Sequence, residues 1–128
     1  VHVQNGNAAR YNSLWQWTCG DGPEFDFQFE KAGDEYYKIK SRYGRCFHIQ
    51  DGPTSNYRKE VWQWECSDAD EFLFELVHSQ DGWLQIKSKA GTCLHVKGGP
   101  NKINGTPLWT WSCEDFPEYF FRLEEVAN

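Results

Sequence analysis

Tryptophan is the residue type whose number and spacing in this chain point most directly to chemistry. Six of the seven tryptophans lie in an element of the form Trp-x-Trp-x-Cys, which occurs three times at intervals of 47 residues. The three pairs are Trp15 and Trp17, Trp62 and Trp64, and Trp109 and Trp111. A flat indole can cover an apolar ligand surface, gaining dispersion contacts and expelling water. Since the chain also has 6 Tyr and 9 Phe, more than core filling demands, we expect part of this aromatic surface to contact a ligand.

Two polar residue types recur together with the tryptophans. A histidine precedes each pair, at His2, His48 and His95, and a glutamate follows each cysteine of the element by five residues, at Glu24, Glu71 and Glu118. Histidine donates or accepts a hydrogen bond according to its tautomer, and a carboxylate is a strong acceptor. Because a nearby glutamate favours the charged imidazolium, we expect binding to change between about pH 5 and 7.

Each recurring residue also has a purely structural interpretation. The tryptophans can be core residues, the histidines can hydrogen-bond their own loops, and the glutamates can be solvated strand ends. Three symmetry-related histidines can also gather a metal on a common axis, but no zinc signature is present and we predict no metal or cofactor. We also predict no enzymatic activity, because a glycosidase needs two carboxylates and each unit has one recurring glutamate.

The 47-residue period indicates one supersecondary unit used three times. Short segments alternate aromatic or β-branched residues with polar ones, for example Phe25, Phe27 and Phe29, and Gly-Pro and Asn-Gly pairs separate these segments. We therefore predict an all-β chain with almost no helix. The repeats span about 1–36, 37–82 and 83–128 and share the core of one domain over 1–128.

Composition excludes several classes of partner. The formal net charge is −6, which argues against nucleic acid and heparin-like polyanions, because their binding needs clustered Lys and Arg. No apolar stretch is long enough to span a membrane, so we expect no membrane insertion. The chain contains no methionine, even at position 1, which favours a mature processed form or a fragment.

The five cysteines follow the repeat. Two pairs have the same spacing of 20 residues, which predicts the disulfides Cys46–Cys66 and Cys93–Cys113. Cys19 is the equivalent of Cys66, but its partner would fall one residue before Val1, so Cys19 is either free or paired between chains. Five reduced thiols in a cytosolic protein are the alternative. The disulfide interpretation favours a secreted, extracellular protein.

The segments Cys46–Gly52 and Trp62–Cys66, followed by an aromatic-x-aromatic segment, resemble the R-type lectins, which are ricin B-chain-like β-trefoils. All three repeats share the pattern, so the resemblance covers the whole chain. It implies a six-stranded barrel capped by three hairpins, with pseudo-threefold symmetry. It also implies galactose or N-acetylgalactosamine binding in one shallow pocket per repeat at most, with Trp17, Trp64 and Trp111 stacking on the sugar.

The chain departs from the family in the same way in every repeat. The family usually has Asp where the three histidines stand, often Gln where the first tryptophan of each pair stands, and Asn where the recurring glutamates stand. Its Gln-x-Trp signature is replaced here by aromatic residues. We interpret three matching departures as a distinct pocket. The candidate carbohydrate-binding residues are His2, Trp15, Trp17, Glu24, His48, Asp51, Trp62, Trp64, Glu71, His95, Trp109, Trp111 and Glu118.

The expected partners follow from this resemblance. They are glycans on glycoproteins or glycolipids, bound at up to three places for higher avidity. A complete trefoil has twelve strands, whereas we count eleven here, and the resulting open edge motivates the hypothesis of a homodimer. The alternative function is a β-trefoil that binds protein, like a cytokine or a protease inhibitor, since fold alone does not determine function. Such a module has no reason to repeat a Trp-x-Trp-x-Cys element three times.

Overall fold

Eleven strands and five single-turn 3₁₀ helices form the regular structure of the residues that the computed structural model describes, 1–7, 12–20, 22–50, 52, 57–97 and 104–124. The strands are β1 (His2–Val3), β2 (Leu14–Trp15), β3 (Phe27–Lys31), β4 (Tyr37–Ser41), β5 (Arg45–Ile49), β6 (Val61–Glu65), β7 (Phe74–His78), β8 (Trp83–Ser88), β9 (Cys93–Val96), β10 (Leu108–Trp111) and β11 (Phe121–Arg122). The 3₁₀ helices are η1 (Gln4–Gly6), η2 (Pro23–Phe25), η3 (Asp70–Phe72), η4 (Gln80–Gly82) and η5 (Pro117–Tyr119). The prediction of an all-β chain is confirmed.

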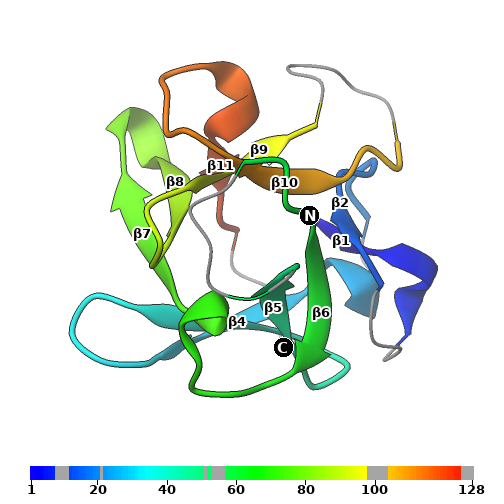
Figure 1. The fold of residues 1–128 in the computed structure, drawn as a ribbon. Coiled ribbons are helices and arrows are strands. Elements are labelled where there is room, and N and C mark those ends of the chain that lie inside the picture. The colour runs from blue at the N-terminus through cyan, green and yellow to red at the C-terminus, as the bar shows by residue number, and fades with distance from the viewer. Residues whose placement is uncertain (8–11, 21, 51, 53–56, 98–103, 125–128) are drawn as a thin grey trace.

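Three antiparallel hairpins carry the repeated tryptophans: β1–β2, β5–β6 and β9–β10. In each hairpin the recurring histidine lies directly opposite the first tryptophan of the pair. These registers are His2↔Trp15, His48↔Trp62 and His95↔Trp109. Figure 1 shows the three hairpins arranged around a common centre, with β3, β4, β7 and β8 continuing the sheet at the periphery.

The strands that carry the tryptophans also pair with one another. Isolated bridges join Ser13 to Trp62, Glu60 to Trp109 and Pro107 to Trp15. The three bridges use equivalent positions of successive repeats, so they close a ring with pseudo-threefold symmetry. The antiparallel pairs β3–β4, β7–β8 and β8–β11 complete the sheet. This architecture is a β-trefoil, as predicted.

Strand alternation decides which side chains reach the core. In β6, Val61 and Gln63 are buried whereas Trp62 and Trp64 are half-buried. The same alternation in β10 buries Leu108 and Thr110 and leaves both tryptophans half-buried. A slip of one residue would exchange the two faces, so burial of the aliphatic residues determines where the indoles point. The core consists of Val3, Leu14, Ile39, Phe47, Ile49, Val61, Phe74, Leu84, Ile86, Leu94 and Leu108.

The cysteine predictions are confirmed for the part of the chain that the structure describes. The two disulfides are Cys46–Cys66 and Cys93–Cys113. Each bridge joins one strand of a tryptophan hairpin to the end of the other, with Cα atoms 5.0 Å apart. Cys19, at the equivalent position of the first hairpin, is free and exposed.

One expectation about local structure is wrong. Phe25 was expected inside a strand, but it ends a 3₁₀ turn, as Phe72 does in the second unit. The strands begin two residues later, at Phe27 and Phe74. The turn of η2 is closed by the Asp26 N–H, which donates to the Pro23 carbonyl. Proline suits the first position of such a turn because its φ is already restricted to a helical value. Aromatic alternation continues through the turn, so it is not a reliable marker of where the strand starts.

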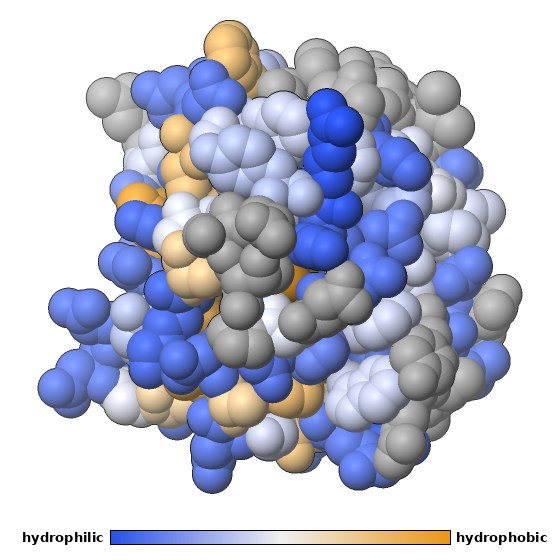
Figure 2. All heavy atoms as spheres, in the orientation of Figure 1, coloured by the Kyte–Doolittle hydropathy of each residue, from blue (hydrophilic) through white to orange (hydrophobic). Residues whose placement is uncertain are grey.

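The surface in Figure 2 is mainly hydrophilic, with hydrophobic residues scattered between charged and polar ones. Among the described residues, no helix has both the length and the apolar character needed to cross a bilayer.

Candidate functional site

The three hairpins assemble three aromatic clusters of the same composition. Each cluster contains the histidine, the two tryptophans of the repeated element and one further aromatic residue. The first cluster is His2, Trp15, Trp17 and Phe25, the second is His48, Trp62, Trp64 and Phe72, and the third is His95, Trp109, Trp111 and Tyr119. Within each cluster the two indoles stack, with ring centroids 5.5, 5.8 and 5.8 Å apart. Residues two apart on a strand share a face, which explains why both indoles of a pair lie together.

The histidine of each cluster accepts a hydrogen bond from the first tryptophan. The Nε1–H groups of Trp15 and Trp62 donate to Nδ1 of His2 and His48 at 2.7 Å. Trp109 donates to Nδ1 of His95 at 3.0 Å. Cross-strand pairing of each histidine with its tryptophan places the two rings side by side.

This bond determines the histidine tautomer. An indole N–H can only donate, so Nδ1 must be the unprotonated nitrogen and a neutral ring carries its proton on Nε2. Protonating Nδ1 would set two N–H groups against each other. At His2 and His48 the Nε2–H is the donor that the ring can offer to a ligand.

The pKa values of His2 and His48 are shifted down from the ordinary 6.5. Burial is the main cause, because it disfavours the charged ring. The carboxylates of Glu24 and Glu71 oppose the shift, as the sequence suggested, but burial outweighs them. Both histidines are therefore neutral at pH 7, and their titration occurs below pH 6.5.

Two of the recurring glutamates, Glu24 and Glu71, act electrostatically on His2 and His48 and also lie near a glycine of the same unit. Glu24 Oε2 would lie 3.6 Å from a Cβ atom placed on Gly6, and Glu71 Oε2 would lie 3.8 Å from a Cβ atom placed on Gly52. Tyr43 donates a hydrogen bond to Glu24, and burial together with this carboxylate raises the pKa of Tyr43. The backbone of Glu118 lies in η5. The Glu118 side chain and the whole of Asp51 lie outside the described part of the chain.

The fourth aromatic residue of each cluster was missed from sequence. Phe25, Phe72 and Tyr119 directly follow the recurring glutamates, and their rings lie 4.8, 4.8 and 4.6 Å from the histidine centroids. The segments that contain them were expected to be strands, and no binding role was assigned to these three residues. The signal was their fixed place after the glutamate, which matches the periodicity of the site.

The tryptophans remain accessible in all three clusters. Trp17 has 43% of its surface exposed, and Trp64 and Trp111 are half-buried. None is sealed inside the barrel. The first cluster is thus the most open to a ligand.

A loop from another unit completes the first and third clusters. A Cβ atom placed on Gly105 would lie 3.4 Å from the Trp15 ring and 3.7 Å from the Trp17 ring. In the third cluster, the Tyr57 ring lies 5.2 Å from Trp111, and the Arg58 guanidinium carbon lies 5.3 Å from the same ring. Arg58 and Gly105 are equivalent by the 47-residue period, so one loop position differs sharply between two clusters.

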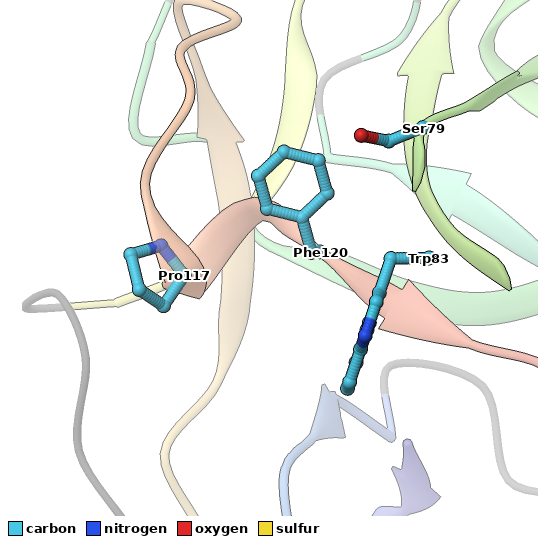
Figure 3. A pocket seen from close by; sticks show the side chains of 4 residues that line it. All are labelled: Ser79, Trp83, Pro117 and Phe120. Carbon is cyan, nitrogen blue, oxygen red and sulfur yellow. The ribbon is translucent and has the colours of Figure 1, made fainter. Parts of the chain in front are cut away.

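A separate hollow of about 290 Å³ is lined by Ser79, Trp83, Pro117 and Phe120 (Figure 3). Trp83 is the tryptophan outside the repeated element, and sequence reasoning assigned it no role. The Arg122 guanidinium carbon lies 4.4 Å from the centre of its ring. Among the described residues, no group of three His, Cys, Asp or Glu side chains is placed to bind a metal ion.

Comparisons with known proteins support the fold. Neither family models nor curated protein sequences match this chain. A designed 3-fold symmetric protein, ThreeFoil, matches with a TM-score of 0.90 and 22% identity, covering 98% of this chain and 89% of the designed chain. An exo-β-1,3-galactanase from Clostridium thermocellum matches with a TM-score of 0.84 and 19% identity, covering 90% of this chain and 25% of the galactanase chain. At these identities the likenesses establish the β-trefoil fold.

Proposed function

We propose that this protein is a lectin of the R-type kind that binds galactose- or N-acetylgalactosamine-containing glycans at up to three aromatic clusters. The observation that carries the proposal is the threefold recurrence of one outward-facing arrangement, a pair of stacked indoles with a histidine held in a defined tautomer. Core packing alone needs no such arrangement, since aliphatic residues together with Phe47 and Phe74 already form the core. We propose binding without catalysis.

Galactose suits such a surface because its axial 4-hydroxyl leaves one face of C–H bonds clear. An exposed indole such as Trp17, 43% accessible, can cover that face and displace water from it. The His2 Nε2–H can then donate to a sugar hydroxyl and the Glu24 carboxylate can accept from one. The aromatic surface provides contact area, and the polar groups orient the sugar.

The departures from the R-type pattern form a matched pair. The family's usual Asp is replaced by the histidine and its frequent Gln by the first tryptophan, and these two replacements hydrogen-bond to each other in every cluster. The histidine and the tryptophan thus replace the family's residues as a hydrogen-bonded pair in each of the three clusters. The galactanase likeness adds support, because that protein acts on a galactose polymer and a quarter of its chain has this fold.

We propose glycans on extracellular glycoproteins or glycolipids as the partners, since structural disulfides persist in oxidising compartments. A single shallow site is expected to bind near millimolar, about −4 kcal/mol. Several sites on one rigid body raise avidity by about 10²–10⁴ on a dense glycan surface. A homodimer is a further part of this proposal, and sedimentation at high protein concentration tests it.

The test uses the indole N–H signals in proton–nitrogen correlation spectra, one for each of the seven tryptophans. Titration with galactose or N-acetylgalactosamine should shift the signals of Trp15 and Trp17, whereas glucose should shift them much less. Trp17→Ala should abolish binding at the first cluster, and the control Trp83→Ala should leave it unchanged. If galactose moves no cluster signal, or if Trp17→Ala binds as well as the wild type, the proposal is wrong.

A further inference from the structure

The third cluster carries two cations that the first cluster lacks. Arg58 lies over Trp111, and the Lys97 ammonium lies 5.4 Å from the centre of the Trp109 ring. The equivalent positions of the first cluster are Gly105 and Gln4. Two exposed cations therefore flank one pair of indoles, on a chain whose net formal charge is −6.

The position of Arg58 is held by hydrogen bonds to the third hairpin. Its N–H donates to the Thr110 carbonyl at 2.7 Å, and the Lys59 N–H donates to Thr110 Oγ1 at 3.1 Å. The Thr110 N–H returns a bond to the Lys59 carbonyl at 2.8 Å. Since Thr110 is fully buried, the loop is anchored directly to the frame that holds Trp111.

Arg58 adopts a backbone conformation that favours glycine. Its φ is +66°, and the equivalent Gly105 has φ +84°. An arginine in this region has a free-energy cost that glycine avoids, and strain of this kind concentrates at functional sites. The third cluster thus has a strained arginine, Arg58, at the position where the first cluster has the unstrained Gly105.

The arrangement suits an anionic ligand. The guanidinium of Arg58 lies over the Trp111 ring, and its planar set of N–H donors matches a carboxylate or a sulfate. Neither Arg58 nor Lys97 forms an ion pair with a carboxylate in the part of the chain that the structure describes. Tyr57, half of whose surface is exposed, adds an aromatic ring beside the guanidinium.

We propose that the third cluster recognises an acidic sugar, a hexose bearing one carboxylate or sulfate group. Arg58 binds the anionic group, Lys97 adds a second positive charge, and Tyr57 with the edge of Trp111 contacts the sugar ring. The net charge of −6 disfavours polyanions, so the ligand carries a single acidic group. This inference rests on the proposed glycan-binding function and assigns the clusters different preferences.

The probes are galactose, galacturonate and galactose 6-sulfate, which share one ring and differ in the acidic group. Binding is measured by calorimetry and by the Trp111 and Trp17 indole signals. We expect an acidic sugar to bind the third cluster about tenfold more tightly than galactose at low salt, with the difference shrinking as salt screens the charges. The two acidic probes distinguish a carboxylate from a sulfate source.

The matched variant is Arg58→Gly, because glycine occupies the equivalent position with the same sign of φ. It should fold with unreduced melting temperature, lose the tenfold acidic preference and leave galactose binding at Trp17 unchanged. The charge control is Lys31→Gln, which changes an exposed residue of β3. It should alter neither the acidic preference of the third cluster nor galactose binding at Trp17. The reciprocal variant Gly105→Arg should give the first cluster an acidic preference, read from the Trp17 signal.

The outcomes separate the two proposals. An acidic preference that is lost in Arg58→Gly and kept in Lys31→Gln supports the inference. Equal binding of all three sugars, or an acidic preference that survives Arg58→Gly, overturns it and leaves the galactose proposal standing. Absence of binding by every sugar overturns both.

Discussion

Replacing Trp62 by phenylalanine tests the hydrogen bond on which the cluster geometry depends. The substitution keeps an aromatic ring on the same strand and removes the Nε1–H that donates to His48 at 2.7 Å. Leaving a buried acceptor unpaired costs about 1–3 kcal/mol. The smaller ring adds a modest packing loss because Trp62 is half-buried, so we expect a total of about 2–3 kcal/mol.

The assay is urea unfolding at about pH 7.5, supported by thermal unfolding, where this loss corresponds to a fall in melting temperature of roughly 8 °C. The control is Trp83→Phe, which also removes an indole but no bond to a histidine. Trp83 is 40% exposed, so we expect a change under about 0.5 kcal/mol.

The penalty should also depend on pH. In the wild type, protonation of His48 at Nδ1 removes the hydrogen bond. When His48 is charged in both proteins, Trp62→Phe therefore lowers the free energy of unfolding by less. The penalty should therefore shrink as the pH falls from about 7.5 toward 4.5. A penalty equal to that of Trp83→Phe, or one independent of pH over this range, would refute the proposed role of the bond. Nitrogen chemical shifts that place the His48 proton on Nδ1 at neutral pH would refute it as well.

Three further outcomes follow from the same structure. Because burial lowers the pKa of His2 and His48, these histidines take up protons in the unfolded state at a higher pH than in the folded state. The free energy of unfolding should therefore be highest above pH 6.5 and fall as the pH drops below it, which urea unfolding at two pH values measures. A rise in stability on acidification contradicts this. Replacing Cys93 and Cys113 by serine opens a loop with a separation of 20 residues and should lower the unfolding free energy by about 3 kcal/mol; a loss under about 1 kcal/mol would show that the bridge constrains little. A thiol reagent should label one cysteine per native chain, Cys19, and Cys19→Ser should label none with its melting temperature unchanged.

Internal repetition made much of this fold predictable. Equivalent residues of a repeat occupy equivalent places, so the 47-residue period located the three tryptophan hairpins, and the spacing of 20 residues identified both disulfides. The start of β3 and β7 was not predictable from alternation. The turns that begin at Pro23 and Asp70 are local hydrogen-bonded structures, and aromatic residues run through them into the strands.

The histidine and both tryptophans of each cluster were predicted from the sequence, whereas the fourth aromatic residue and the bonding inside the cluster were not. His48 and Trp62 were each selected as site residues, but their hydrogen bond depends on cross-strand register, which one sequence does not reveal. The net direction of the histidine pKa shift depends on how deeply the ring is buried, which also requires coordinates. Tyr57 and Arg58 escaped notice because they come from a different unit than the tryptophan they contact.

The bridges from Ser13 to Trp62, from Glu60 to Trp109 and from Pro107 to Trp15 make each hairpin depend on a neighbour. An excised repeat would lack one wall of its own cluster. Exchange of a single inter-strand loop alters one cluster and leaves the hydrogen-bonded frame and the other two untouched. The three clusters can therefore be altered one at a time, and a designer can introduce a new preference into one cluster without redesigning the barrel.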